Sequence, residues 1–253
     1  MVVNEMARRI FPDSKLFQEL AAAFAKAAKT ALSKKERITV ALAGGRTPRA
    51  FYEVLVSDEY KKRIDWERID FFFGDERDVS PMSERSNYRL TNEFLFKPLG
   101  IDKSQVFRWQ TEIIEVSEVA ANYEKIIRRY FSLGEGEFPV FDFVFLGVGD
   151  DGHTASLFPF TDALAEKNRI AVANRVEKFD SYRLTLSYPV FNAAKNVFFV
   201  VTGSSKASAV AEVLIGDKNC TKYPAQCIKP KGGKLTWFIG ESAASDLKGK
   251  AAA

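Results

Sequence analysis

The chain has 253 residues, 46% of them hydrophobic, and carries 37 basic against 33 acidic side chains. A charged fraction of 28% together with 22 phenylalanines is typical of a soluble globular protein and argues against a disordered chain. The net charge of +4 arises without a dense run of lysine and arginine. No apolar stretch approaches the roughly 18 residues of a membrane helix, and the first residues lack the apolar core of a secretory signal. We therefore expect a cytoplasmic monomer with no nucleic-acid partner and no membrane partner.

The first predicted elements are a helix, a strand and a second helix. Residues 14–32 are rich in alanine and have apolar side chains at helical spacing, which predicts an amphipathic helix. Residues 37–43, "RITVALA", predict a buried strand, and "GGRTP" ends it. Thr47 and Pro48 then have the residue types favoured at the N-cap and at the first position of a helix.

The later elements continue the alternation of strands and helices. In chain order they are a strand at residues 69–73, a helix from Ser86 to "KPLG", a helix at 117–131, strands at "FDFVFLGV", "RLTLSYPV" and "NVFFVVTG", a helix closed by Gly216, a strand at "KLTWFIG" and a short helix at "ESAASDL". This order predicts an α/β fold with a mostly parallel, Rossmann-like sheet and helices on both faces. No linker rich in serine, glycine or proline divides the chain, so we expect residues 1–253 to form one domain, with "LGEGEFP" as a loop.

Two cysteines, Cys220 and Cys227, and a single histidine, His153, limit the metal and redox chemistry of the chain. Without a secretory signal, one cysteine pair predicts free thiols in a reducing compartment, and a disulfide or half of a metal site is the less favoured interpretation. One histidine excludes a histidine-rich zinc site, and a Cys-Cys-His site would require distant segments to converge. We expect neither a metal nor a cofactor.

Unusual polar or glycine-rich segments follow four of the predicted strands. They are "AGGRTP", "GDERDVS", "GVGDDGHTAS" and "VTGSSKAS". If the strands are parallel, these segments meet at one edge of the sheet, where α/β proteins bind their ligands. With "SYRLTLS" they would surround one pocket, and this convergence is a stronger signal than any single motif.

The segment "AGGRTP" has the features of an anion site. Gly44 and Gly45 permit backbone conformations closed to other residues, and N–H groups at the start of a helix favour an anion. Thr47 adds a hydroxyl, although the segment also fits a plain tight turn. Arg183 and Lys206 add positive charge that suits a phosphate, although each also fits an ordinary exposed cation.

The histidine lies in "GVGDDGHTASLFP", next to aspartates and glycines. Asp150 and Asp151 are close enough in sequence for a carboxylate to orient the His153 ring and raise its basicity, as general-base chemistry requires. The alternative is a structural histidine after an N-cap aspartate. No G-x-S-x-G segment is present, so the nucleophile would be water. Asp75 and Arg77 directly follow a predicted buried strand, which often marks a site but also fits a solvated turn with a local ion pair.

Together these segments resemble the 6-phosphogluconolactonase family, within the larger group that includes glucosamine-6-phosphate deaminase. The resemblance is carried, in the family's order and spacing, by "LAGGRTPRAFYEVL", "FFFGDERDVSPMSERSNYRL", "FDFVFLGVGDDGHTASLFP", "RLTLSYPVFNAAKNVFFVVTG", "SSKA" and "YPAQCI". It implies a fold of the NagB/RpiA type and hydrolysis of 6-phospho-D-glucono-1,5-lactone in the pentose phosphate pathway. The sugar-phosphate lactone would then be the small-molecule partner of the chain.

The resemblance also implies roles for individual residues. The substrate-binding residues would be Gly44, Gly45, Arg46, Thr47, Arg77, Arg183 and Lys206, and the catalytic residues His153, Asp151 and Asp75. Deaminases of the group carry a glutamate where this chain has Phe158, and "DEY" where it has "DER", so the resemblance favours the lactonase. A non-catalytic sugar-phosphate sensor is the alternative outside the enzymes, but it would typically carry a DNA-binding module, for which the chain has no room.

Overall fold

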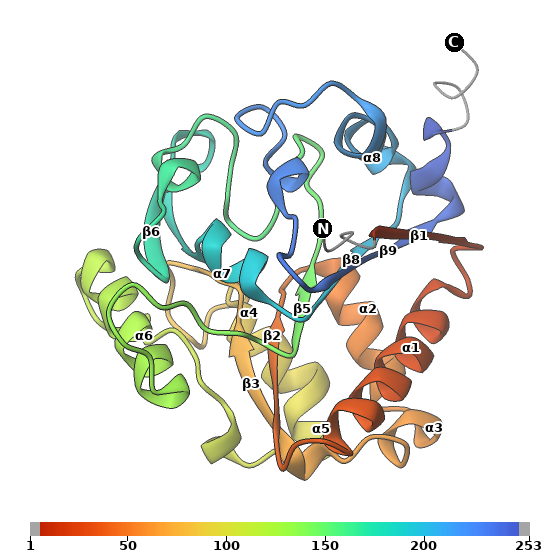
Figure 1. Ribbon diagram of the computed structural model, residues 1–253, viewed down its shortest axis with the longest axis horizontal. Helices are drawn as coiled ribbons and strands as arrows, with labels where there is room; N and C mark the ends of the chain where they lie inside the picture. Colours follow the sequence, from red (N-terminus) through yellow and green to blue (C-terminus); the bar gives the residue numbers. More distant parts are fainter. Residues whose placement is uncertain (1–5, 248–253) are drawn as a thin grey trace.

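The protein is built on two sheets of different size (Figure 1). The computed structural model describes residues 6–247, and within them the main sheet has six parallel strands in the order β1-β9-β8-β5-β2-β3. Its strands are β1 (Met6–Phe11), β2 (Ile38–Leu42), β3 (Ile69–Phe73), β5 (Phe143–Leu146), β8 (Asn196–Val201) and β9 (Lys234–Gly240). The small sheet is antiparallel, in the order β4-β7-β6, and its strands are β4 (Asp75–Arg77), β6 (Ala171–Val176) and β7 (Ser181–Leu186).

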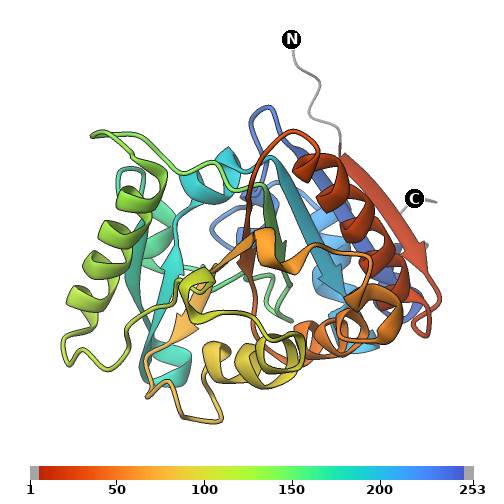
Figure 2. The ribbon, with the colours of Figure 1, turned by 90° about the horizontal axis from the view of Figure 1, so that it is seen from below.

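Helices lie on both faces of the main sheet. They are α1 (Leu16–Leu32), α2 (Arg46–Leu55), α3 (Asp58–Lys61), α4 (Asn87–Thr91), α5 (Lys97–Leu99), α6 (Val116–Phe131), α7 (Tyr188–Ala193) and α8 (Ala207–Ile215). α1 and α2 pack together on one face and α8 lies on the other, whereas α6 packs against the small sheet (Figures 1 and 2). Within residues 6–247, no helix has the length and apolar character needed to cross a membrane.

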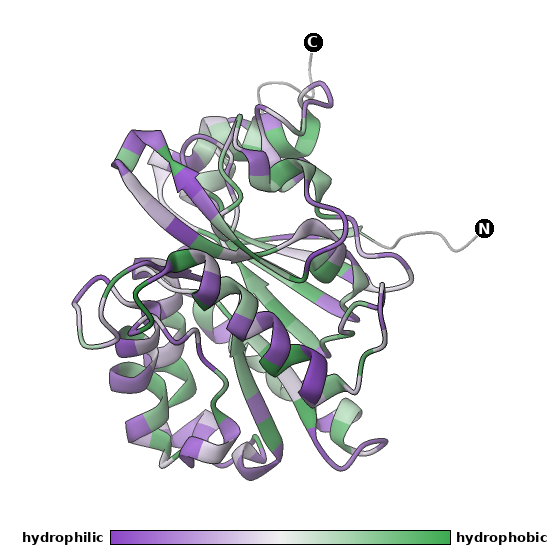
Figure 3. Ribbon diagram, turned by 90° about the vertical axis from the view of Figure 1, so that its left-hand side faces the viewer, coloured by the Kyte–Doolittle hydropathy of each residue, from purple (hydrophilic) through white to green (hydrophobic). Residues whose placement is uncertain are grey.

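The central strands of the main sheet are buried between these layers, which explains why they appear in the sequence as mainly apolar runs. Every residue of β2 and of β3 is buried, and Phe24 of α1 sets its ring edge-on to Phe143 and Phe145 of β5, with centroids 5.3 Å apart in both pairs. Apolar residues dominate the central strands in Figure 3, and polar residues lie on the outer faces of the helices. Burial of each such phenylalanine contributes about 1.5–3 kcal/mol.

The predicted α/β class with a mostly parallel sheet is confirmed. The strand at residues 69–73 lies where it is predicted, and the first helix begins at Leu16 rather than at residue 14. The four polar segments follow β2, β3, β5 and β8, whose common direction brings them to one edge of the main sheet. That edge carries the candidate site.

Two of the other predicted boundaries are also wrong. Helix α2 begins at Arg46 with Gly45 as its N-cap, so Thr47 lies inside the first turn. Gly45 has φ 107°, a conformation that disfavours side chains, and the chain can therefore enter the helix two residues early. The predicted strand "RLTLSYPV" ends at Leu186, because α7 begins at Tyr188.

The small sheet was not predicted at all. β7 pairs antiparallel with β4 and β6 instead of joining the main sheet. β4 has only three residues, which is too short for a periodic pattern. β1 was also missed, because it lies at the edge of the main sheet with most of its side chains exposed and lacks the apolar run of the central strands.

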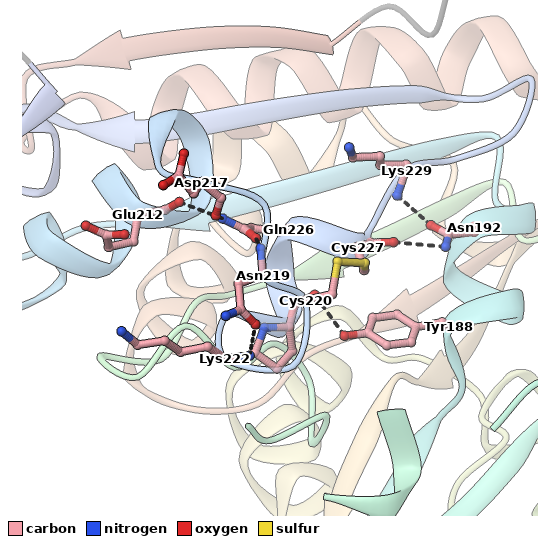
Figure 4. Close-up of a disulfide and its surroundings, with 11 residues drawn as sticks. Tyr188, Asn192, Glu212, Asp217, Asn219, Cys220, Lys222, Gln226, Cys227 and Lys229 are labelled. Atoms are coloured by element: carbon pink, nitrogen blue, oxygen red, sulfur yellow. Dashed lines mark hydrogen bonds between the residues drawn. A yellow bond between two sulfur atoms is a disulfide. The ribbon is translucent and has the colours of Figure 1, made fainter. Parts of the chain in front are cut away.

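The sequence predicts free thiols at Cys220 and Cys227, and this prediction is wrong. The two residues form a disulfide, with their Cα atoms 5.6 Å apart (Figure 4). A tight turn over Pro224–Cys227 reverses the chain and brings the two cysteines within bonding reach. Free thiols are predicted from the lack of a secretory signal, which concerns the cellular compartment. The disulfide instead follows from the local turn, which brings the two sulfur atoms together.

Candidate active site

A cleft of about 230 Å³ lies at the carboxyl edge of the main sheet. The predicted site residues that line it are Gly44, Arg46, Thr47, Asp75, Arg77, His153 and Lys206. Three of the predicted site residues do not line the cleft, but each of them adjoins or contacts a residue that lines it. Gly45 adjoins the glycine loop, Asp151 is bonded to the histidine, and Arg183 lies opposite Arg77 in the small sheet.

The loop after β5 brings His153 to the cleft, and Asp151 holds its ring. His153 Nδ1 lies 2.5 Å from Asp151 Oδ1, and the backbone N–H of His153 donates to the same oxygen at 3.2 Å. Burial opposes the ionisation of Asp151, but the hydrogen bonds from His153 and the nearby Lys178 ammonium outweigh it and hold the pKa of this carboxyl well below its usual range. Asp151 therefore accepts the Nδ1 proton at neutral pH, which leaves Nε2 as the free ring nitrogen.

Glycine at position 149 is needed for this close arrangement. An ideal Cβ at Gly149 would lie 2.0 Å from His153 Nδ1. The Gly149 N–H also donates to the His153 carbonyl at 2.8 Å and closes a tight turn around the ring. The backbone of the loop thus packs directly against the imidazole.

The disulfide loop, residues 220–227, supports the same turn from outside. The Ala225 N–H donates to the Gly152 carbonyl at 3.0 Å, and a Cβ at Gly152 would lie only 2.7 Å from the Tyr223 ring. The disulfide therefore closes a loop that contacts the residue directly before His153.

An aromatic stack covers one face of the histidine. The rings of His153 and Phe158 are 4.0 Å apart between centroids, with an angle of 28° between their planes. Phe179 meets Phe158 edge-on at 5.5 Å, and the Arg183 guanidinium carbon lies 4.9 Å from the centre of the Phe179 ring. Phe158 thus packs against the histidine itself.

Asp75 is held by two side chains that sequence reasoning missed. The Ser156 hydroxyl donates to Asp75 Oδ2 at 2.7 Å, and the Asn87 amide donates to Asp75 Oδ1 at 3.3 Å and to its backbone carbonyl at 3.0 Å. Asp75 is only 8% exposed, so these donors compensate a carboxylate that water reaches poorly. Ser156 lies in "DGHTAS" and Asn87 in "SNYRL", two of the segments that carry the family resemblance. Their place in these segments is the sequence feature that could have marked them as site residues.

Glu76 joins β4 to the start of α4 and so fixes Asn87. Its buried carboxylate accepts the backbone N–H groups of Asn87 at 2.7 Å and Tyr88 at 2.8 Å, and the Ser86 hydroxyl at 3.1 Å. Burial raises the pKa of Glu76 despite these donors. The Asn87 side chain in turn fills the space over Gly44, where a Cβ would lie 1.7 Å from Asn87 Oδ1.

Two arginines face each other across the small sheet. Arg77 and Arg183 are direct partners in the register of β4 and β7. Burial lowers the pKa of the Arg183 guanidinium, and the neighbouring Arg77 and Arg85 charges lower it further. Like charges opposite each other destabilise a strand pair, so the arrangement favours an anion nearby.

Lys206 lies where β8 leads into α8. Ser204–Lys206 form a single tight turn and α8 begins at Ala207, so the lysine directly precedes the helix. Arg46 and Thr47 occupy the first turn of α2 on the same cleft. Two helix starts, each with backbone N–H groups and a cation, therefore contribute to one cleft. Within residues 6–247, no three His, Cys, Asp or Glu side chains are grouped so that they could hold a metal ion.

The sequence and the fold are similar to those of known proteins. Residues 12–237 match the family described as glucosamine-6-phosphate isomerases/6-phosphogluconolactonase. The chain belongs to this family. The family member from Nostoc, a 6-phosphogluconolactonase, is 36% identical over 218 residues, which cover 86% of this chain and 88% of that protein.

Solved structures of family members agree with the fold. The crystal structure of 6-phosphogluconolactonase from Thermotoga maritima has a TM-score of 0.80 at 29% identity and covers 94% of this chain and 100% of that one. A monomeric glucosamine-6-phosphate deaminase has a TM-score of 0.79 at 21% identity, covers 95% of this chain and 100% of that one, and shares the fold.

Proposed function

We propose that this chain hydrolyses 6-phospho-D-glucono-1,5-lactone to 6-phospho-D-gluconate. The observation that carries the proposal is the Asp151–His153 pair, whose free ring nitrogen belongs to a cleft also lined by Arg46, Arg77 and Lys206. A base and several cations around one cleft match a substrate that carries both a reactive ester and a phosphate. Two family relatives named 6-phosphogluconolactonase support the same reading.

In the proposed reaction, His153 takes a proton from water as the water oxygen attacks C1. The bond between C1 and the ring oxygen then breaks, and the imidazolium returns its proton to the departing oxygen, which gives the carboxylic acid and a hydroxyl group. General acid–base catalysis of this kind contributes about 10²–10⁴-fold. The ionised Asp151 holds the ring and stabilises the imidazolium, and a δ-lactone is reactive enough to need no covalent intermediate.

Asp75 would act near the same end of the substrate. Its carboxylate is fixed by Ser156 and Asn87 and lines the cleft, so it can accept a hydrogen bond from a sugar hydroxyl next to C1. Orienting C1 against the histidine in this way adds to the rate, because substrate binding already supplies the entropy cost of bringing the reacting groups together.

The phosphate would bind at the two helix starts. Lys206 precedes α8, and Arg46 and Thr47 begin α2 beside the turn at Gly44 and Gly45. A phosphate there gains backbone N–H donors and positive charge at once. The opposed pair of Arg77 and Arg183 adds charge that an anion would stabilise.

The deaminase alternative lacks a carboxylate at position 158, beside the histidine. Phe158 stacks on the histidine where deaminases of the group carry a glutamate, and a phenylalanine cannot transfer the protons that ring opening of an amino sugar requires. Lactone hydrolysis needs one base that returns its proton, so the aromatic residue is compatible with it.

The test is a pair of assays on the purified chain. We expect rapid consumption of 6-phosphogluconolactone, after subtraction of spontaneous hydrolysis, and no ammonia from glucosamine 6-phosphate. His153→Asn should lower kcat by roughly two orders of magnitude or more while its thermal unfolding stays that of the parent. Ammonia release without lactonase activity would overturn the assignment, and a fully active His153→Asn would overturn the role of the base.

A further inference from the structure

A second cleft lies at the opposite edge of the main sheet from the candidate active site. It has a volume of about 530 Å³ and is bounded by α1, by Asp142 directly before β5, and by residues of β1, β8 and β9. The candidate active site lies at the far ends of the same strands, so the two clefts share no lining residue. We call it the far-edge cleft.

The far-edge cleft concentrates positive charge. Among the described residues that line it, the basic ones are Arg9, Lys26, Lys34, Lys35, Lys195 and Lys234, and the only acidic one is Asp142. The local excess of five positive charges is larger than the excess of four over the whole chain. The rest of the molecule is therefore close to neutral, and this cleft is not a sample of a uniformly basic surface.

Two ammonium groups in the cleft share one carboxylate oxygen. Lys35 Nζ lies 2.7 Å and Lys195 Nζ 3.0 Å from the same atom, Asp142 Oδ1. Asp142 is 2% exposed, and its other oxygen accepts the N–H of Thr39 at 3.1 Å. Each ammonium has three donors, and within residues 6–247 its hydrogen bond to Asp142 is the only one it makes. One buried carboxylate thus gathers two lysines and neutralises only one of them.

The walls of the cleft provide further cations and room for a ligand. Lys26 and Lys34 are exposed on or just after α1, and neither pairs with a carboxylate anywhere in residues 6–247. Three of the α1 residues that line the cleft are alanines, Ala23, Ala27 and Ala31, and they lie beside Lys26 and Thr30 of the same helix. Small side chains at this spacing leave the helix surface open, and the volume falls within the range of small-molecule sites, about 300–1,000 Å³.

We propose that the far-edge cleft binds a small polyanion with a chain of two or three phosphate groups. A single phosphate would neutralise only part of the excess charge, whereas a phosphate chain offers several anionic groups to the lysines that line the cleft. Charge-assisted hydrogen bonds to ammonium groups are the contacts that such a chain makes. A free polyphosphate and a nucleoside triphosphate share this chemistry.

The test is isothermal titration calorimetry at low salt with tripolyphosphate, ATP and inorganic phosphate as separate probes. We expect one saturable site for tripolyphosphate and much weaker binding of inorganic phosphate. ATP binding tighter than tripolyphosphate would assign the site to nucleotides, and equal or weaker binding would assign it to the phosphate chain alone.

Substitutions then place the site. Lys195→Gln should raise the Kd for tripolyphosphate about tenfold, the value of one charge-assisted hydrogen bond, and Lys26→Gln by at least about threefold. Lys29→Gln is the matched control, because Lys29 is exposed on the same helix but outside the cleft. Lys26→Gln should also fold like the parent, since Lys26 is exposed and makes no ion pair in the described chain. A loss of binding in this variant therefore cannot be attributed to misfolding.

Three results would overturn the proposal. The first is the absence of saturable binding by any phosphate chain. The second is an equal loss of affinity in Lys29→Gln and Lys26→Gln, which would mean a diffuse charge effect. The third is a loss of binding in Lys206→Gln with none in Lys195→Gln, which would place the polyanion in the other cleft.

Discussion

The sharpest test of the histidine's position is Gly149→Ala, a single added methyl group. An ideal Cβ there would lie 2.0 Å from His153 Nδ1, 2.2 Å from its Cε1 and 2.8 Å from Asp151 Oδ1. Gly149 is not among the described residues with positive φ, so alanine introduces no backbone strain and the perturbation is purely steric. The ring and its carboxylate are the atoms that have to move.

The expected magnitude follows from these distances. Ordinary heavy-atom contact lies at about 3.5–4.0 Å, so the imidazole must retreat by more than about 1 Å or swing away and break its 2.5 Å contact with Asp151. Misplacement of a reacting group by 1 Å can cost about 10²-fold. We therefore expect kcat for the lactone to fall about a hundredfold. The His153 side chain is 24% exposed, so the loss of stability should stay near 1 kcal/mol and the variant should fold.

The assay is the rate of lactone loss, corrected for spontaneous hydrolysis, together with a thermal unfolding curve. Gly134→Ala is the matched control, because a Cβ there meets nothing closer than 3.4 Å and the residue is remote from the cleft. A Gly149→Ala enzyme with the parent's kcat would refute the argument, since it would mean that the ring position seen here is not needed for catalysis.

Three further predictions concern the same cleft. Lys206→Ala should raise KM about ten- to a hundredfold, the value of one charged hydrogen bond, and should reduce the preference over unphosphorylated gluconolactone; an unchanged KM would place the phosphate elsewhere. Because its pKa is held below the ordinary value of 3.8, Asp151 should stay ionised and keep its hold on the ring as the pH falls toward that value; a carboxyl resonance of Asp151 that shows proton uptake by NMR above pH 3.8 would contradict this. Phe158→Leu should lower kcat about two- to tenfold through loss of ring stacking, and Phe158→Tyr should retain it; equal rates in the parent and Phe158→Leu would show that the stack does not position the base.

The central strands could be predicted from the sequence because both of their faces are buried. β2, β3, β5, β8 and β9 are mainly apolar, and the parallel direction expected of them was enough to predict that the polar segments after β2, β3, β5 and β8 would meet. β1 and the small sheet could not be predicted in the same way. An exposed edge strand and a three-residue strand carry no periodic signal, and their pairing depends on partners far away in the chain.

The candidate site was predictable as a set of motifs but not as a set of contacts. His153 and Asp151 are two residues apart, so their pairing is visible in the sequence. Ser156 meets Asp75 across 81 residues, and the Arg77–Arg183 pair exists only through the antiparallel register of a sheet that was not predicted. Tertiary packing creates these contacts, and no local pattern records them.

The disulfide between Cys220 and Cys227 also affects how this enzyme has to be handled. Its loop contacts Gly152 through Ala225 and Tyr223, and Gly152 is bonded to the histidine in the chain. A preparation kept in dithiothreitol and one purified in air would therefore differ covalently at Cys220 and Cys227, in a loop that contacts the residue directly before the base. Rate constants for this chain can be compared only when the content of free thiol is stated. A mixed preparation would contain an oxidised and a reduced population, and the measured rate would be the sum of their two rates.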